Sequence, residues 1–187
     1  MNRSSPMPIR STCFVRDDHG VSAVEFALIV PVILILLIGM VDINEGLTVY
    51  RKMRQISSTV TDLVAQRSQI TSAEITMTLQ GSASLLAPYD TTDLDIVLSV
   101  VNVEQAGQTV AWSRSYQATA ETAGSEPRFP VPADLAENGV QVVAVRVDYT
   151  FDTLSSGLLE SILGRSGYVM QDTMYERPRV GDSIVLN

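Results

Sequence analysis

Residues 20–41 read GVSAVEFALIVPVILILLIGMV: an apolar run that starts at Ala27 and is preceded by one carboxylate, Glu25. A helix rises about 1.5 Å per residue, so residues 21–41 would measure about 31 Å, enough to cross a hydrocarbon core of about 30 Å. A charged side chain deep in a bilayer costs about 2.5–3.5 kcal/mol, and for that reason it marks function by default. The stretch therefore predicts a membrane-spanning helix whose carboxylate takes part in molecular recognition.

The composition fits a membrane-anchored protein with one modest folded domain. A length of 187 residues allows one domain with a short appendage. The net charge of −8 and the lack of any basic cluster argue against nucleic acid as a partner. The single cysteine, Cys13, precedes the apolar run. A chain cut at residue 20 would therefore contain no disulfide, and packing alone would stabilise it.

Four interpretations compete for the N-terminal segment. A secretory signal has an apolar region of about 7–15 residues followed by a small-residue cleavage site, but here the run is longer and residues 41–45 lack such a site. A lipoprotein signal places its cysteine after an apolar segment, whereas Cys13 comes before it. An uncut signal anchor fits the length and leaves Glu25 unexplained. A prepilin-type leader accounts for polar residues 1–20, for Gly20 at the cut and for Glu25 as the fifth mature residue.

Residues 20–31, GVSAVEFALIVP, resemble the start of TadE-like proteins, the minor pseudopilins of tight-adherence pili. Tyr149-Thr150-Phe151 and Arg177-Pro178-Arg179 are similar to later features of that family, and the length suits its short type. The resemblance implies that a prepilin peptidase cuts between Gly20 and Val21, and that Glu25 and Phe26 serve assembly recognition. It also implies partners: other pilin or pseudopilin subunits and the pilus assembly platform.

These observations predict four segments and a topology. Residues 1–20 form the leader, 21–41 the transmembrane half of a helix, 42–70 its amphipathic extension, and 71–187 a periplasmic domain. The basic residues on the two sides of the span are nearly balanced, but the acidic exit at Asp42 and Glu45 favours a cytoplasmic N-terminus. The prepilin resemblance implies the same orientation. We therefore expect a single-pass protein of the bacterial inner membrane.

The fold class expected is α+β: a long N-terminal helix on a small, mainly antiparallel sheet. Beyond the membrane, an apolar stripe at three- and four-residue steps predicts a core-facing helix: Ile43, Leu47, Tyr50, Met53, Ile56, Val60 and Leu63. Thr71 and Glu74 form a capping-box pattern that predicts the start of a second helix. Strands are expected at 94–103, 109–116, 140–149 and 168–175, with an exposed loop at 118–132 and a short helix at 154–163.

Residues for catalysis are hard to find in this chain. The sole histidine, His19, lies in the predicted leader, so a mature chain has no histidine for a triad or a metal site. Asp90, Asp93 and Asp95 lack the ligand pattern of a calcium loop, and a solvated edge explains them better. Trp112 is expected in the core, and Arg177 and Arg179 in a polar tail. We therefore expect no enzyme activity, no metal and no cofactor.

The sequence thus favours a minor pilin-like subunit that supports assembly or priming of a tight-adherence pilus. The alternative is a single-span periplasmic sensor or enzyme on an uncleaved anchor. The two hypotheses differ at the N-terminus, which is cut in the first and intact in the second.

Overall fold

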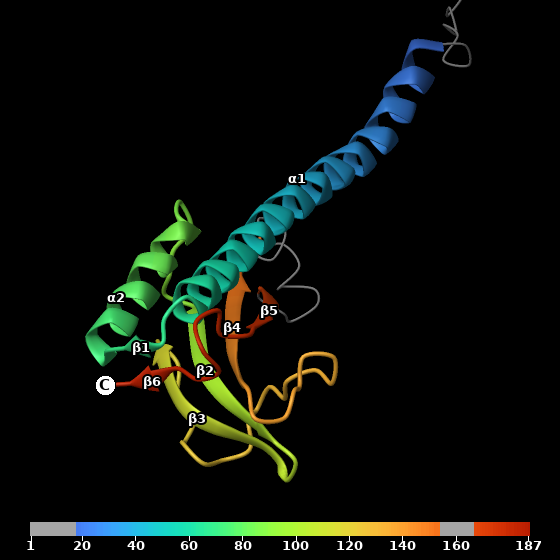
Figure 1. The fold of residues 1–187 in the computed structure, drawn as a ribbon. Helices are drawn as coiled ribbons and strands as arrows, with labels where there is room; N and C mark the ends of the chain where they lie inside the picture. Colours follow the sequence, from blue (N-terminus) through green and yellow to red (C-terminus); the bar gives the residue numbers. More distant parts are fainter. Residues whose placement is uncertain (1–17, 154–166) are drawn as a thin grey trace, which may run out of the picture. The chain divides into compact units, whose positions relative to one another are not determined.

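A computed structural model describes residues 18–153 and 167–187. The chain divides into two compact units, Met1–Met40 and Val41–Asn187. Helix α1 (Asp18–Ala65) begins in the first unit and ends in the second (Figure 1), with Pro31 in its interior. In the first unit nearly every side chain from Val21 onward is exposed, so no protein core holds this part of the helix.

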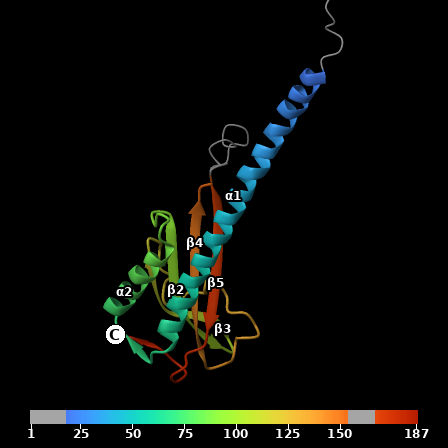
Figure 2. The same ribbon diagram turned by 90° about the horizontal axis from the view of Figure 1, so that it is seen from above.

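The second unit is built on a four-stranded sheet in which all neighbouring strands are antiparallel. Its strands are β2 (Leu94–Glu104), β3 (Gly107–Tyr116), β4 (Gln141–Phe151) and β5 (Tyr168–Glu176), in the order β3-β2-β4-β5. Figure 2 shows β4 and β5 running alongside the C-terminal part of α1. The predicted α+β class, with a long helix followed by an antiparallel sheet, is confirmed.

One face of α1 contributes a continuous row of apolar side chains to the core. The row follows three- and four-residue steps, as an amphipathic helix requires. Its fully buried members are Val49, Met53, Ile56, Val60 and Val64.

The predicted stripe on this helix was therefore only partly right. Met53, Ile56 and Val60 are buried, but Ile43, Leu47, Tyr50 and Leu63 are exposed. Successive helical residues are turned by about 100° from one another, so Val49 and Tyr50 point in different directions. The sheet packs against the side that carries Val49, and Ile43, Leu47 and Tyr50 are left outside the core.

The second helix, α2 (Ser72–Ala83), begins as the capping box predicted. The Thr71 backbone N–H donates to the Glu74 carboxylate at 2.9 Å, and the Glu74 N–H donates to Thr71 Oγ1 at 3.3 Å. Ile75 and Leu79 bury one face of the helix, and a short 3-10 turn, η1 (Ser84–Leu86), follows it.

Residues 177–187 are a structural strap rather than the predicted polar tail. Within them, β6 (Val185–Leu186) pairs in parallel with β1 (Gln69–Ile70), a pair that the sequence did not predict. The Arg179 backbone N–H donates to the Ala65 carbonyl at 2.8 Å. This bond satisfies a carbonyl in the last turn of α1, which ends at Ala65 and not at the predicted residue 70.

The guanidinium groups of the strap also have partners in the same unit. Arg179 pairs with Asp62 on α1 and with Glu176, each at 2.6 Å. Arg177 pairs with Glu137, and its Nη2 donates to the Leu135 carbonyl at 3.1 Å. These arginines therefore fasten the strap to the unit.

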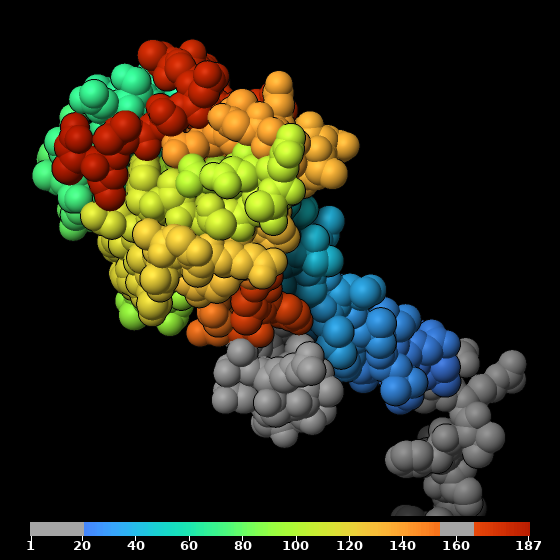
Figure 3. Space-filling view, turned by 60° about the horizontal axis from the view of Figure 1, so that its bottom comes forward, coloured from blue at the N-terminus to red at the C-terminus, as the bar shows by residue number. Residues whose placement is uncertain are grey.

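The loop after β3 covers part of the sheet face opposite α1 and α2 (Figure 3). Most of its residues are exposed, as predicted, but the Glu121 side chain is only 2% exposed. That carboxylate accepts from Ser99 Oγ at 3.0 Å and from the Arg128 backbone N–H at 3.0 Å. A buried carboxylate needs such partners, and here they fix the loop to the sheet. The predicted helix at 154–163 lies outside the described residues.

Candidate functional site

The four residues predicted to carry processing and assembly all lie in the first turns of α1. Gly20, Val21, Glu25 and Phe26 follow the helix start at Asp18. Val21 and Glu25 are four residues apart, so both point to one side of the helix, while Phe26 is turned by about 100° from Glu25. Phe26 is 69% exposed, and Glu25 is exposed as well. Their roles in processing and assembly remain predictions.

Glu25 is the only Asp, Glu, Lys or Arg between residues 21 and 41. An ion removed from water is costly unless a charge of opposite sign accompanies it. The first basic residue after it in the sequence is Arg51, about 39 Å further along a helix at 1.5 Å per residue. Within the apolar run, no other side chain of the same chain can therefore serve as the counter-ion of a desolvated Glu25.

By length and composition, the part of α1 that begins at Val21 qualifies as one candidate membrane span, and none of its most apolar window is buried inside the protein. This defines a class: a chain that one N-terminal helix can anchor in a membrane, followed by a small α+β unit. The model of the TadE-like protein family matches residues 20–43. The match confirms the resemblance to TadE-like proteins and associates the chain with tight-adherence pili. No curated protein and no solved structure matches the chain.

The match covers all four predicted site residues and ends at residue 43. The part of the second unit after residue 43 lies outside the match. Three features stand out there: a groove beside α2, an acidic group near the start of β2, and a groove beside the start of β5.

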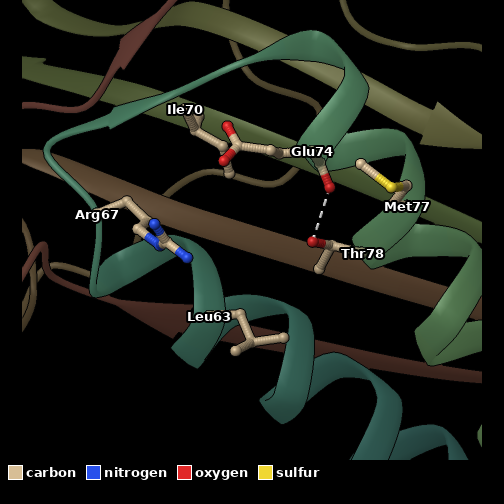
Figure 4. Close-up of a pocket in the computed structure, with 6 residues that line it drawn as sticks. All are labelled: Leu63, Arg67, Ile70, Glu74, Met77 and Thr78. Carbon is tan, nitrogen blue, oxygen red and sulfur yellow. Dashed lines mark hydrogen bonds between the residues drawn. The ribbon is translucent and has the colours of Figure 1, made fainter.

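Figure 4 shows the groove beside α2, which has a volume of about 240 Å³. Leu63, Arg67 and Ile70 line one side, and Glu74, Met77 and Thr78 line the other. Hydrogen bonds from the backbone and side chain of Thr71, together with the charge of Arg67, hold the pKa of Glu74 below its usual value. The carboxylate is thus already committed to capping α2, and the groove presents no activated nucleophile or base.

The acidic residues near the start of β2 do not gather into a metal site. Asp95 lies opposite Asp148 on β4, and Arg146 Nε donates to both Asp148 oxygens at 3.0 Å. Burial raises the pKa of Asp95, and the charges of Asp148 and Asp93 raise it further. Among residues 18–153 and 167–187, no three Asp, Glu, His or Cys side chains are placed to hold a metal ion.

The predicted core position of Trp112 is confirmed. Trp112 is 8% exposed, and its Nε1–H donates to the Ile184 carbonyl at 2.9 Å. The side chain is therefore committed to core packing and to the strap, and it does not form a ligand platform.

The third feature is an apolar groove of about 310 Å³ where α1 meets the ends of β4 and β5. It was not predicted, because Ile43 was assigned to the core and the sequence pattern does not show that α1 packs against the ends of these strands. Its lining residues are Asp42, Ile43, Gly46, Phe151, Thr153, Tyr168 and Met170. Ile43 lies outside the buried row on α1, which the sequence pattern alone does not reveal.

Proposed function

We propose that the protein is a non-enzymatic, minor pilin-like subunit that supports assembly or priming of a tight-adherence pilus. One observation carries this proposal: within the segment that matches TadE-like proteins, the exposed apolar stretch 21–41 contains a single charged side chain, Glu25. A segment that only anchored the chain would have no use for that charge.

In this mechanism a prepilin peptidase cuts between Gly20 and Val21 and creates an ammonium group on Val21. Glu25 of a neighbouring subunit then pairs with that ammonium. The pair offsets part of the desolvation that either ion would suffer alone in a low-dielectric environment. The apolar surface of the helix, with Phe26 among its exposed side chains, packs laterally against other subunits.

The proposal includes a topology and a set of partners. The N-terminus lies in the cytoplasm, α1 spans the inner membrane, and residues after about 43 are periplasmic. The partners are the peptidase, other pilin or pseudopilin subunits and the assembly platform. A reporter that is active only in the periplasm, fused after Asn187, should be active, whereas activity confined to a cytoplasmic reporter would contradict this orientation.

The experiment that tests the function is a substitution series at Glu25, with piliation and co-purification of partner pilins as the measurements. Glu25→Ala and Glu25→Gln should insert and be cleaved, since a neutral helix enters a bilayer more easily than a charged one. Both should lose assembly, because the neighbour's ammonium loses its counter-ion. Glu25→Asp should fall between them and the wild type, since it keeps the charge on a shorter side chain.

Leu28→Ala is the matched control, because Leu28 lies in the same segment and is 70% exposed but carries no charge. It should assemble like the wild type. Full piliation by both Glu25→Ala and Glu25→Gln would exclude the proposed role of the carboxylate. The alternative, an uncut sensor or enzyme anchor, predicts an intact N-terminus and tolerance of Glu25→Leu.

A further inference from the structure

The groove beside β5 lies at the beginning of the second unit. Asp42, Ile43 and Gly46 of α1 form one wall, and Tyr168 and Met170 of β5 form the other. The contact between the walls is close: a Cβ added to Gly46 would lie 3.4 Å from Met170 Cε. The groove is therefore a fixed part of the packing between α1 and the sheet.

The rim of this groove is apolar and exposed. Ile43 and Tyr168, which line the groove, are 67% and 56% exposed. Leu47, one helical turn after Ile43 on the same side of α1, is 49% exposed. None of the three belongs to the core, whose α1 row starts at Val49. We call Ile43, Leu47 and Tyr168 the apolar rim.

The apolar rim lies close to the end of the apolar sequence. Val41 is the last residue of the apolar run and the first residue of the second unit. At about 1.5 Å per residue, Ile43 lies about 3 Å beyond Val41 along α1, and Gly46 lies about 7.5 Å beyond it. The hydrocarbon core of a bilayer is about 30 Å thick and the whole bilayer about 40–45 Å, which leaves about 5–7 Å for the headgroups on each side.

We propose that the apolar rim is a lipid-contact surface, seated at the boundary between headgroups and acyl chains in the leaflet from which α1 emerges. This inference rests on the membrane anchoring in the proposed function. The exposed tyrosine fits this position, since Tyr is enriched at membrane interfaces, where its ring is apolar and its hydroxyl is wet.

The distribution of charge favours uncharged lipid over anionic lipid as the partner. Among the described residues that line the groove, Asp42 is the charged one. The basic residues Arg51, Lys52 and Arg54 begin about 15 Å beyond Val41 along the helix, further than the headgroup layer extends. The contact should therefore form on zwitterionic membranes and should not require anionic headgroups.

The test places one nitroxide label at a time on the full chain in phosphatidylcholine vesicles. Tyr168→Cys reports the apolar rim, Leu28→Cys reports the anchor, and Ala106→Cys at the exposed β2–β3 turn is the aqueous control. Cys13→Ser in every variant leaves a single thiol. Each label's accessibility to oxygen, which partitions into lipid, is compared with its accessibility to a water-soluble nickel chelate, and Trp112 fluorescence checks that each variant folds.

The Leu28 label should lie in hydrocarbon, and the oxygen-to-nickel ratio at Tyr168 should be several-fold higher than at Ala106. Adding phosphatidylglycerol should leave that ratio unchanged. A Tyr168 ratio equal to that of Ala106, with the Leu28 label still in hydrocarbon, would overturn the lipid contact alone. A Leu28 label outside the hydrocarbon would overturn the anchoring as well. Spin–spin broadening at Tyr168 that weakens on dilution with unlabelled protein would assign the rim to a second copy of the chain. An oxygen-to-nickel ratio at Tyr168 that rises only when phosphatidylglycerol is added would make the contact electrostatic. Both outcomes contradict the inference.

Discussion

Helix α1 contains two regions that use their apolar side chains in different ways. In the first unit, apolar side chains such as Phe26 and Ile33 are exposed on all sides of the helix. In the second unit, the apolar side chains of one face, Ile56 among them, are fully buried against the sheet and α2.

The difference shows that the two regions place different requirements on the amino-acid sequence. A helix that is apolar all round suits a lipid solvent, in which one aliphatic side chain can replace another. A helix packed on a core needs a particular volume at each buried position, because interiors are close-packed. Sensitivity to substitution should therefore be concentrated at Gly20 and Glu25 in the first region and spread over all buried positions in the second.

The largest expected effect is at Gly20. Gly20→Leu should leave full-length protein in the membrane, because a bulky side chain would obstruct the peptidase at the cut. Mass spectrometry of the N-terminus should find Val21 first in the wild type and an unprocessed chain in the variant.

Gly39→Leu is the matched control for Gly20→Leu, since Gly39 lies in the same apolar segment and nothing lies within 4 Å of an added Cβ. It should be processed normally. An unprocessed N-terminus in wild-type cells that make the pilus would refute the prepilin interpretation, and the first region would then be a plain anchor.

The next effect compares two isoleucines of the same helix. Ile56→Ala should lower the free energy of unfolding of the second unit by about 2–5 kcal/mol, because it removes buried methyl groups and leaves a cavity. Ile33→Ala should leave that free energy unchanged, since Ile33 is 54% exposed in the first unit. Denaturant titration in detergent, monitored by the fluorescence of the buried Trp112, measures the free energy of unfolding of both variants. Equal effects of Ile56→Ala and Ile33→Ala would contradict the proposed difference between the two regions.

The smallest effect concerns charge in the second region. The pKa of Glu74 lies below its usual value in the folded protein. The ionised carboxylate therefore stabilises α2 fully at pH values above that usual pKa. The contribution is lost as the pH falls through the lowered pKa. Glu74→Gln, which keeps the capping geometry, should therefore be less stable than the wild type at pH 7, and the difference should disappear in acid.

Denaturation midpoints measured from pH 7 down to pH 3 test this prediction. Glu104→Gln, at the β2–β3 turn, controls for removal of one negative charge from the same unit. A Glu74→Gln difference that persists unchanged at low pH would mean that the carboxylate's charge does not stabilise the cap.

The elements that the sequence predicted well are those set by local patterns. The capping box at Thr71 and Glu74, the apolar run to Val41 and the β-branched strands could be predicted because neighbouring residues decide them. The role of the strap could not be predicted from the sequence. The partner of Trp112, the carbonyl of Ile184, lies 72 residues away, and no local pattern records such a contact.

The apolar stripe on α1 failed for a different reason. Ile43 and Leu47 have the spacing of a core face, yet the core uses Val49 and Met53 instead. Periodicity gives the repeat of an amphipathic helix but not which of two apolar faces meets the sheet. The same ambiguity concealed the groove beside β5, which combines residues of α1 with residues of β4 and β5 more than 100 positions later.

The pairing of β1 with β6 also governs how this unit can reach its native state. All strands of the sheet are synthesised before Val185 and Leu186, so these two residues pair with Gln69 and Ile70 last. Ile184 can complete the core only at that stage. Contacts of such high contact order form slowly, because closing a long loop costs entropy before the contact is made. The core is therefore incomplete until residues 184–186 have been made, because Ile184 is one of its buried side chains.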